Sequence, residues 1–483
     1  MVSPQGLVQP VLVNGIEHVL VASCLGELTG GGLCMGGIGG MQVVDRLSST
    51  GLFVKDGLVA RALWTPSQMA EMAELLIYDH KGVLGYQRLD ATADVHDVLL
   101  LDDGGCVVVS TGTNELIWYS EGGQVVKRWR AEGEGDSWHL NSLLQHAGEL
   151  YACAFGKFQK HREWAQAKDS GSGCVIKIST GEVVLTGLMC PHNPRLSGDS
   201  WILCNSARGE LVEVDAASQV ITRSQSLGGW TRGLAFADEH VFVGVSANRQ
   251  YRDPGVSASI AVLDRQSWQV TGRIELPFEE VYDLVLLPPE QVLGLQRGFA
   301  TSPSRTAEQE RYALFRQAGV EPTRLWPSGD PLASESCRIQ VTAQVPEVMT
   351  IGTRVQIPCE VRNAGNAILA TMPPCPVHIS YKWLDPATGK RLADTEGLRT
   401  RLSRSLLPGE ALTCQLVVQA PALEGEWIVA VTLVQEQVAW FDDLDPGSSF
   451  RKKVSVCSIA RAWISDLPAV QRAGCPLACG RGN

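Results

Sequence analysis

The chain has 483 residues, of which 45% are hydrophobic and 19% are charged, so it can bury a large core and should form two or three domains. Its net charge of −11, with no dense patch of Lys and Arg, argues against a nucleic-acid binder and against binding to an anionic membrane. The 49 glycines and 24 prolines follow no short period, which indicates many turns and favours β structure.

The first residues, "MVSPQGLVQPVLVNGIEHVLVASC", lack a basic segment followed by an apolar one, and no uninterrupted apolar run reaches about 18 residues. We therefore expect a cytoplasmic protein that is not inserted in a membrane. The 14 cysteines are scattered through strand-like text, so we expect reduced core thiols. In the tail, Cys475 and Cys479 form a lone Cys-x3-Cys, which is weak evidence for a zinc site.

A pattern of paired strands recurs along the first 300 residues. Each copy has a polar or aromatic residue, a short apolar strand, a turn of Gly, Asp, His or Pro, and a second apolar strand. Clear copies are "VHDVLLLDDGGCVVVS", "WHLNSLLQHAGELYACAFG", "PHNPRLSGDSWILCNS", "TRGLAFADEHVFVGVS" and "VYDLVLLPPEQVLGLQ", preceded by "STGLFVKDGLVARALW". Their first residues lie about 40 to 50 residues apart, the period of β-propeller blades.

The count of these starts predicts the number of blades. Six starts lie near residues 50, 96, 139, 192, 232 and 282, and the last has only two clear strands. Strands in "HVLVASC" and "GGMQVVDRL" near the N-terminus would complete that blade and remove two exposed sheet edges. We predict a six-bladed β-propeller over residues 11–298, with seven blades as the alternative.

In a propeller the innermost strand of each blade lines a central channel. The polar residues that open the strands should therefore converge on one axis as a ligand site. They are His96, Asp97, His139, Asn141, His192, Asn193, Arg195, Arg232, Glu279, Glu280, Tyr282 and Asp283. The alternative is that such residues only tie the turns between blades through hydrogen bonds.

Several of these stretches carry a family resemblance: "WHLNSL", "SGCVIKISTGEVVLTGLMCPHNPR", "LCNSARGEL", "TRGLAF", "FVGVSANR" and "FEEVYDLVLLP". Over roughly residues 11–300 the chain resembles a family of uncharacterised bacterial proteins that carry a domain of unknown function. The family usually has Ser-Pro-Arg where this chain has Asn193-Pro194-Arg195, and its insertion is longer than "ANRQYRDPGVSAS". The resemblance implies the fold and the motif set, and it implies no reaction.

The composition of the sequence changes after the predicted propeller. Residues 299–336 are polar and punctuated by Pro and Ser, which predicts a linker, with a short helix in "TAEQERYALFRQAG". Alternating strands over residues 337–458 predict an immunoglobulin-like β-sandwich, and residues 459–483 are left as a tail. In the adjacent pair Trp440 and Phe441, side chains on a strand face opposite ways, so one of the two should be exposed.

The sandwich carries a second resemblance, in "SYKW" (380–383), "GLRT" (397–400), "LPGE" (407–410) and "VQE" (434–436). It is similar to modules appended to surface-polysaccharide glycosyltransferases, methyltransferases and export proteins of bacteria. The resemblance implies a context of glycan assembly, with a glycosyltransferase or another assembly protein as partner.

Two functions remain open from the sequence. The preferred one is an accessory protein that binds a sugar, a sugar nucleotide or another small anionic ligand, gripped by Arg195 and Arg232. The alternative is a metal-dependent lyase or epimerase of a uronate-type sugar. His96, His139 and His192 would then hold a divalent cation, and Tyr282 or Glu280 would take part in catalysis.

Overall fold

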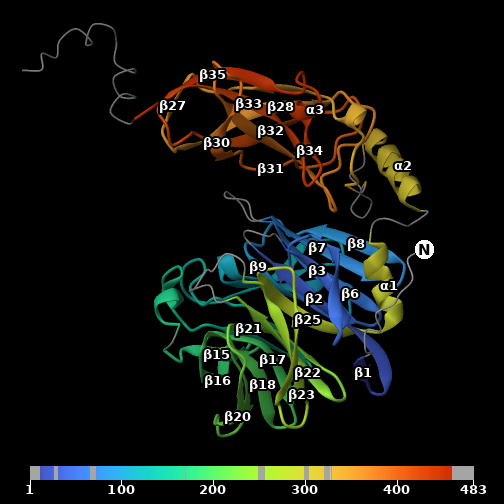
Figure 1. The fold of residues 1–483 in the computed structure, drawn as a ribbon, viewed down its shortest axis with the longest axis vertical. Helices are drawn as coiled ribbons and strands as arrows, with labels where there is room; N and C mark the ends of the chain where they lie inside the picture. The colour runs from blue at the N-terminus through green and yellow to red at the C-terminus, as the bar shows by residue number, and fades with distance from the viewer. Residues whose placement is uncertain are drawn as a thin grey trace, which may run out of the picture. The chain divides into compact units, whose positions relative to one another are not determined.

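The computed structural model describes residues 11–26, 31–65, 72–168, 170–247, 256–298, 304–319, 327 and 329–458. Contacts between residues divide the chain into two compact units, with the boundary between residues 303 and 304 (Figure 1). Each unit is all-β apart from short helices.

The first unit consists of repeated antiparallel sheets, each with four strands in chain order except the first, which has five. The first sheet contains β1 (Val11–Val13), β2 (Ile16–Leu25), β3 (Gly32–Gly37), β4 (Gly40–Asp45) and β25 (Glu280–Leu287). The next two contain β5 (Ser49–Lys55), β6 (Leu58–Thr65), β7 (Met72–Asp79) and β8 (Gly82–Arg88), then β9 (Val95–Leu100), β10 (Cys106–Ser110), β11 (Glu115–Tyr119) and β12 (Val125–Arg130).

The remaining three sheets follow the same rule. They contain β13 (Leu143–His146), β14 (Glu149–Ala154), β15 (Gly173–Lys177) and β16 (Glu182–Leu188), then β17 (Pro191–Ser197), β18 (Ser200–Asn205), β19 (Glu210–Asp215) and β20 (Ile221–Ser226), and finally β21 (Trp230–Phe236), β22 (His240–Ser246), β23 (Ser259–Asp264) and β24 (Val270–Glu275). Short 3-10 helices η1 (Thr111–Thr113), η2 (Glu163–Gln166) and η3 (Ser206–Arg208) interrupt the connections.

Burial changes systematically across each sheet. Among the first strands, β9 is buried throughout and β5 and β17 are buried over their first four residues, whereas the last strands are mostly exposed, as in β12 and β20. Strand β25 lies beside β5, and the series continues through β9, β13, β17 and β21 back to β25. The first strands therefore enclose one axis, and the unit is β-propeller-like, as the strand repeats predict.

Strands from both ends of the first unit meet in one sheet. β2 pairs antiparallel with β25, from Val19 opposite Leu287 to Leu25 opposite Glu280. On its other side β2 pairs with β3. Hydrophobic side chains fill the space between neighbouring sheets, for example Leu20 of β2 with Phe242 of β22 and Ile260 of β23.

One predicted strand is wrong. The stretch "PEQVLGLQR" after β25 forms helix α1 (Pro289–Arg297), which packs against β8 (Figure 1). Proline is well tolerated at a helix N-terminus, and Glu290 in the first turn and Arg297 in the last suit the helix dipole. The edge of β25 that a second strand would have used is occupied by β2.

The second unit is a pair of facing sheets. It begins with α2 (Ser304–Gln317) and η4 (Ser334–Ser336). One sheet contains β26 (Ile339–Ala343), β28 (Arg354–Asn363) and β32 (Ala411–Gln419). The other contains β27 (Val348–Thr350), β35 (Phe450–Cys457), β33 (Gly425–Gln435), β29 (Val377–Leu384) and β30 (Arg391–Glu396), with β31 (Thr400–Arg401) and β34 (Ala439–Trp440) paired to it, and α3 (Phe441–Leu444) follows β34.

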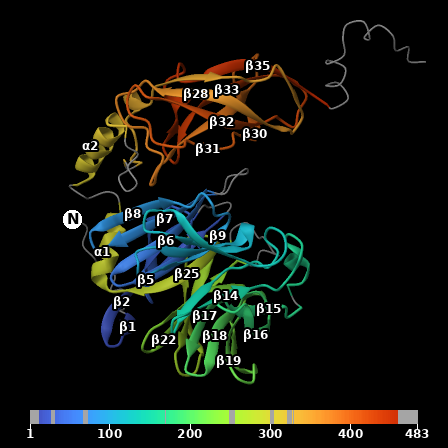
Figure 2. The same cartoon turned by 180° about the vertical axis from the view of Figure 1, so that it is seen from behind.

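Side chains from both sheets of the second unit form its core, among them Trp383, Leu416 and Val431. Helix α2 lies at one end of the strands in both views, and its Tyr312 hydroxyl donates to the carbonyl oxygen of Ser405 at 3.5 Å (Figure 2). The helix thus packs on the sandwich, within the segment where a linker helix was expected.

One of the adjacent pair Trp440 and Phe441 is partly exposed, but strand alternation is not the reason, because Trp440 ends β34 and Phe441 begins α3. Phe441 is fully buried in the sandwich core, whereas Trp440 is partly exposed. The Trp440 ring is covered by the cations of Lys382, Arg399 and Arg391, which lie 4.8, 4.9 and 5.5 Å from its centroid. These cation–π contacts stabilise the partly exposed indole ring.

The cysteines in the described ranges are free, and all except Cys414 and Cys457 are buried. Cys475 and Cys479 lie outside these ranges. No helix within the described ranges is long and apolar enough to cross a membrane.

Candidate functional site

Two histidines from neighbouring sheets meet near the axis. The His96 and His139 rings lie edge to face, with centroids 5.0 Å apart. The carboxylate of Asp136 accepts the His139 Nδ1 proton at 2.9 and 3.1 Å from its two oxygens. His96 donates Nδ1–H to the carbonyl oxygen of Asp94 at 3.1 Å. Burial lowers the pKa of His96 to about 4, so this ring is neutral at pH 7 and its Nε2 is an acceptor.

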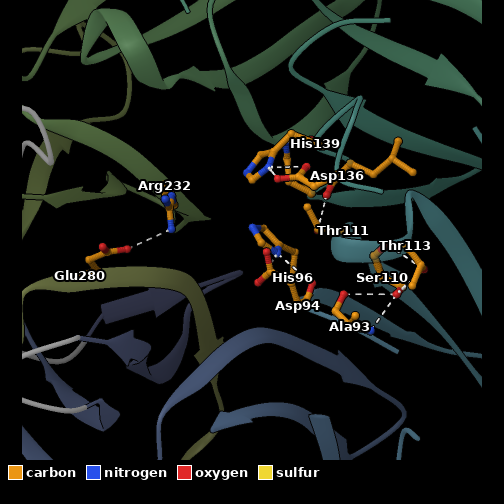
Figure 3. Close-up of polar contacts among 12 residues, drawn as sticks. Ala93, Asp94, His96, Ser110, Thr111, Thr113, Asp136, His139, Arg232 and Glu280 are labelled. Carbon is orange, nitrogen blue, oxygen red and sulfur yellow. Dashed lines mark hydrogen bonds and ion pairs between the residues drawn. The ribbon is translucent and has the colours of Figure 1, made fainter. Parts of the chain in front are cut away.

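Arg232 and Tyr282 complete this side of the axis. The Arg232 guanidinium carbon lies 4.5 Å from the centroid of the Tyr282 ring, and Tyr282 lies 5.3 Å from His96. Arg232 Nη1 donates to Glu280 at 3.3 Å. Figure 3 shows His96, His139 and Arg232 directed toward a common space. Arg232 is only 2% exposed, so it is a buried cation, and its contacts include the Glu280 carboxylate and the faces of the Tyr282 and Trp230 rings.

His192 joins this group through two aromatic rings. Phe155 lies between His139 and His192, at 4.1 and 5.3 Å, and Trp230 lies between His192 and Arg232. The contacts therefore form a closed circuit around the axis. We call His96, His139, His192, Arg232 and Tyr282 the axial cluster.

A cavity of about 10 Å³ lies beside the axial cluster. It is lined by His96, Asp97, Asn141, Ser142, His192, Asn193, Tyr282 and Asp283. Its size suits about one water molecule. Two buried atoms among these residues, His192 Nε2 and Asn141 Oδ1, have no hydrogen-bond partner in the part of the chain that the structure describes. His192 donates Nδ1–H to the carbonyl oxygen of Cys190, so its neutral Nε2 is an acceptor, and one water can donate to both atoms.

The expected three-histidine metal site is not formed. Within the described ranges, no group of three or more His, Cys, Asp or Glu side chains is placed to hold a metal ion. The reason is geometric, because Phe155 separates His139 from His192. The Nδ1 atoms of His96, His139 and His192 bond to Asp94, Asp136 and Cys190, which leaves only their Nε2 atoms as possible ligands.

Asp97, Asn193 and Asp283 tie neighbouring sheets together. Asp97 accepts the backbone N–H of Leu143 at 2.7 Å, which joins β9 to β13. Asn193 Oδ1 accepts the N–H of Gly233 at 2.7 Å, which joins β17 to β21. Asp283 accepts the N–H of Leu52 at 3.1 Å, joining β25 to β5, and also accepts Asn193 Nδ2–H at 3.0 Å. The contacts of these three residues support the alternative raised from the sequence, in which polar residues tie neighbouring sheets together through hydrogen bonds.

Arg195 does not join the axial cluster. Its guanidinium donates to the carbonyl oxygens of Pro194 at 3.0 Å and Leu234 at 3.2 Å. It lines a separate cavity of about 560 Å³, which also touches Asp97, Asn193 and Asp283 but no residue of the axial cluster. The predicted single pocket is therefore two spaces separated by the layer of Asp97, Asn193 and Asp283.

The region that contains the axial cluster also has a match among known families. Residues 77–293 match the model of a domain of unknown function (DUF4915). The DUF4915 match includes every residue of the axial cluster, together with Asp136, Arg195 and Glu280. No curated protein matches the chain.

Solved structures similar to this chain include a putative 6-phosphogluconolactonase from Bacteroides fragilis, with 12% identity over 56% of this chain and 98% of that one and a TM-score of 0.38. Regucalcin from Agrobacterium tumefaciens has 12% identity over 49% and 77%, with a TM-score of 0.33. The WD40 domain of Neurospora crassa Pan2 has 12% identity over 49% and 68%, also with a TM-score of 0.33. With TM-scores below 0.5, these likenesses carry no functional argument.

Sequence reasoning missed four side chains that shape the site in the DUF4915 region. Asp136 orients His139, and Phe155, Trp164 and Trp230 pack on the histidines. Asp136 had a local signal, since it stands three residues before His139 in "DSWHLN". His139 itself has φ = 50°, a left-handed conformation that costs a non-glycine residue on the order of 1 kcal/mol or more and is often retained at functional sites.

From the buried carboxyl group of Asp283 we predict that the stability of the first unit depends on pH. Burial raises its pKa to about 6, whereas an unfolded Asp titrates near pH 4. Its contribution to stability is therefore complete below about pH 4 and is lost as the pH rises to about 6, by roughly 2–3 kcal/mol. We expect Asp283→Asn to cost more stability at pH 4 than at pH 7 by this amount, measured by urea unfolding.

Two comparisons isolate this effect. The lowered pKa of His96 acts in the opposite direction in both proteins, so it cancels in the difference between wild type and variant. Asp56→Asn, in an exposed turn, is the matched control and should give a pH-independent difference. Parallel stability curves for wild type and Asp283→Asn would contradict the prediction.

Proposed function

We propose that the first unit binds a small sugar-type acid at the axial cluster, with Arg232 as the group that takes the carboxylate. The observation that carries the proposal is the convergence of a buried guanidinium with a neutral imidazole and a carboxylate-oriented imidazole. Arginine binds a carboxylate through paired hydrogen bonds, and imidazoles suit sugar hydroxyls as partners.

The ligand would meet the cluster from the solvent side. The free volume beside the axis suits only a water molecule, whereas the His139 and Glu280 side chains keep 10% and 13% of their surface exposed. A carboxylate arriving there competes with Glu280 for Arg232. That ion pair measures 3.3 Å, longer than a tight charge-assisted hydrogen bond, so the ligand carboxylate would share Arg232 with Glu280.

Three broader features belong to the proposal. The six sheets would be the blades of one closed propeller over residues 11–298, and the second unit an immunoglobulin-like sandwich over 337–458. The glycan-assembly context and a glycosyltransferase-type partner rest on the resemblance of the sandwich. A cytoplasmic location is supported by cysteines scattered without a disulfide pattern, and the absence of a nucleic-acid partner by the net charge of −11.

Titration calorimetry with D-glucuronate and D-galacturonate tests the binding. We expect Arg232→Gln to weaken the affinity of the full chain about ten- to a hundredfold, the range of one lost charged hydrogen-bond pair. Arg130→Gln, at an exposed position on β12, is the matched control and should leave the affinity unchanged. If neither uronate binds wild type, or if both variants bind alike, the proposal fails.

The hydrogen bond between Asp136 and His139 favours a second candidate, proton transfer to and from the same ligand. In this role Asp136 accepts the hydrogen bond from His139 Nδ1, and His139 Nε2 removes the proton on the carbon next to the carboxylate and returns a proton to the same face, the reversible exchange with which an epimerisation begins. Proton NMR in D2O would follow exchange at C5 of the uronate. Exchange abolished in His139→Gln, with binding retained, supports catalysis; binding without exchange in wild type leaves the protein as a binder.

A further inference from the structure

The cavity that Arg195 lines has the properties of a ligand site distinct from the axial cluster. Its volume of about 560 Å³ lies within the range of small-molecule pockets, roughly 300–1,000 Å³. Its residues come from the first strands β5, β9, β13, β17, β21 and β25 and from the start of the chain. None of them belongs to the axial cluster, because the layer of Asp97, Asn193 and Asp283 lies between.

The walls of this cavity are apolar. Side chains from successive first strands contribute to them, namely Leu52, Val54, Leu99, Leu143, Leu234, Phe236, Leu284 and Leu286. Such walls favour a ligand with a hydrocarbon body, since each buried Å² of apolar surface contributes about 25 cal/mol. His18, Lys55 and Gln145 are further polar lining residues, of which His18 bonds the Ile16 carbonyl oxygen and Lys55 pairs with Asp102.

Arg195 supplies hydrogen-bond donors at the polar end. Two of its N–H groups donate to the carbonyl oxygens of Pro194 and Leu234, which fixes the plane of the guanidinium. Its remaining N–H groups have no acceptor among the described residues. A ligand oxygen in the cavity would accept hydrogen bonds from these N–H groups without breaking the bonds to Pro194 and Leu234.

The charge around Arg195 selects the kind of oxygen. The buried carboxyl groups of Asp97 and Asp283 lie close enough to Arg195 for its positive charge to lower their pKa values, although burial raises both. At pH 7 a carboxylate or phosphate would be repelled by the Asp283 carboxylate, whose pKa burial raises only to about 6, and an amine would be repelled by Arg195. An uncharged hydroxyl or carbonyl oxygen meets neither penalty.

We propose that this cavity binds an uncharged amphipathic molecule, with a ring or aliphatic body between the first strands and a hydroxyl or carbonyl oxygen on Arg195. The site is distinct from the uronate site proposed above, because no residue of the axial cluster lines this cavity. The first unit would then receive two unlike ligands from opposite sides of the Asp97, Asn193 and Asp283 layer.

Three probes with one body and different ends test the site: 2-naphthol, naphthalene and 2-naphthoate. At pH 7 we expect saturable one-to-one binding of 2-naphthol to the full chain by titration calorimetry, at least about tenfold tighter than for the other two. Arg195→Met should reduce 2-naphthol to the affinity of naphthalene. Equal affinity of wild type for the three probes, or no saturable binding, would overturn the proposal.

Two further variants test whether 2-naphthol binds in this cavity or at the axial cluster. Gln145 is exposed and lines the cavity, so Gln145→Trp should fold normally and weaken all three probes by narrowing the space. Arg232→Gln, on the other side of the layer, should leave 2-naphthol binding unchanged. If Arg232→Gln weakens 2-naphthol while Gln145→Trp does not, the probe occupies the axial side and the second site is refuted, whatever the uronate titrations give.

Discussion

Deletion of residues 1–45 is expected to unfold the whole first unit rather than to remove one sheet from it. The deletion takes away β1 to β4 and leaves β25 with an unpaired edge. It also removes Leu20, Ala22 and Cys24 from the core that they form with Phe242 and Ile260 of the neighbouring sheet. Because the first strands form a closed series, the loss of one sheet leaves two others with an exposed apolar face.

Differential scanning calorimetry of the full chain measures this effect. We expect the truncated chain to lose the transition of the first unit while that of the second unit persists. A shorter deletion, residues 1–15, removes only β1 and leaves the pairing of β2 with β25 intact, so it should retain a weakened transition. An unchanged first-unit transition after the longer deletion would disprove this role of β2.

Replacement of Arg61 by Met is expected to cost the first unit about 3–5 kcal/mol of unfolding free energy, the range measured when one partner of a buried ion pair is removed. Arg61 is completely buried, and its guanidinium makes two bonds of 2.6 and 2.7 Å to Asp45. It also donates to Ser49 Oγ, the Leu47 carbonyl oxygen and the Tyr78 hydroxyl. The variant leaves Asp45 without its partner and several acceptors unsatisfied at the junction of the first two sheets.

A matched pair on the surface provides the control. Arg128 bonds Glu115 at 2.7 Å, but its side chain is 42% exposed, so Arg128→Met should cost less than about 1 kcal/mol. Urea unfolding of both variants gives the comparison. Similar costs for Arg61→Met and Arg128→Met would show that burial of the first pair has no special effect.

The coarse fold could be predicted because it depends on a repeated local pattern. Apolar strands separated by turn residues every 40 to 50 residues or so match the repeated four-stranded sheets, and the N-terminal strands pair where an open edge had to be covered. The error at Pro289–Arg297 came from a short apolar run that suits either a strand or a helix. Only the tertiary position of β2, which occupies the edge of β25, excludes the strand.

The sequence pattern could predict which side chains meet near the axis, but not how far along the channel each one lies. Positions opening the first strands do converge, and they bring His96, His139, Arg232 and Tyr282 together. Arg195 stands three residues beyond His192, past an irregularity in the pairing of β17 with β18, and therefore lies further along the channel. The sequence pattern does not show how far along the channel each side chain lies. It also does not show the aromatic rings that separate the histidines.

The pairing of β2 with β25 also constrains the order of events during synthesis. The ribosome releases β2 early, yet its partner emerges only after five further sheets have been made. Until then β2 presents an open backbone edge and an apolar face, both suited to pairing with another nascent chain. The interval before β25 emerges is therefore the period in which the protein most needs a chaperone or dilute conditions, and a pause in translation before residue 280 would lengthen it.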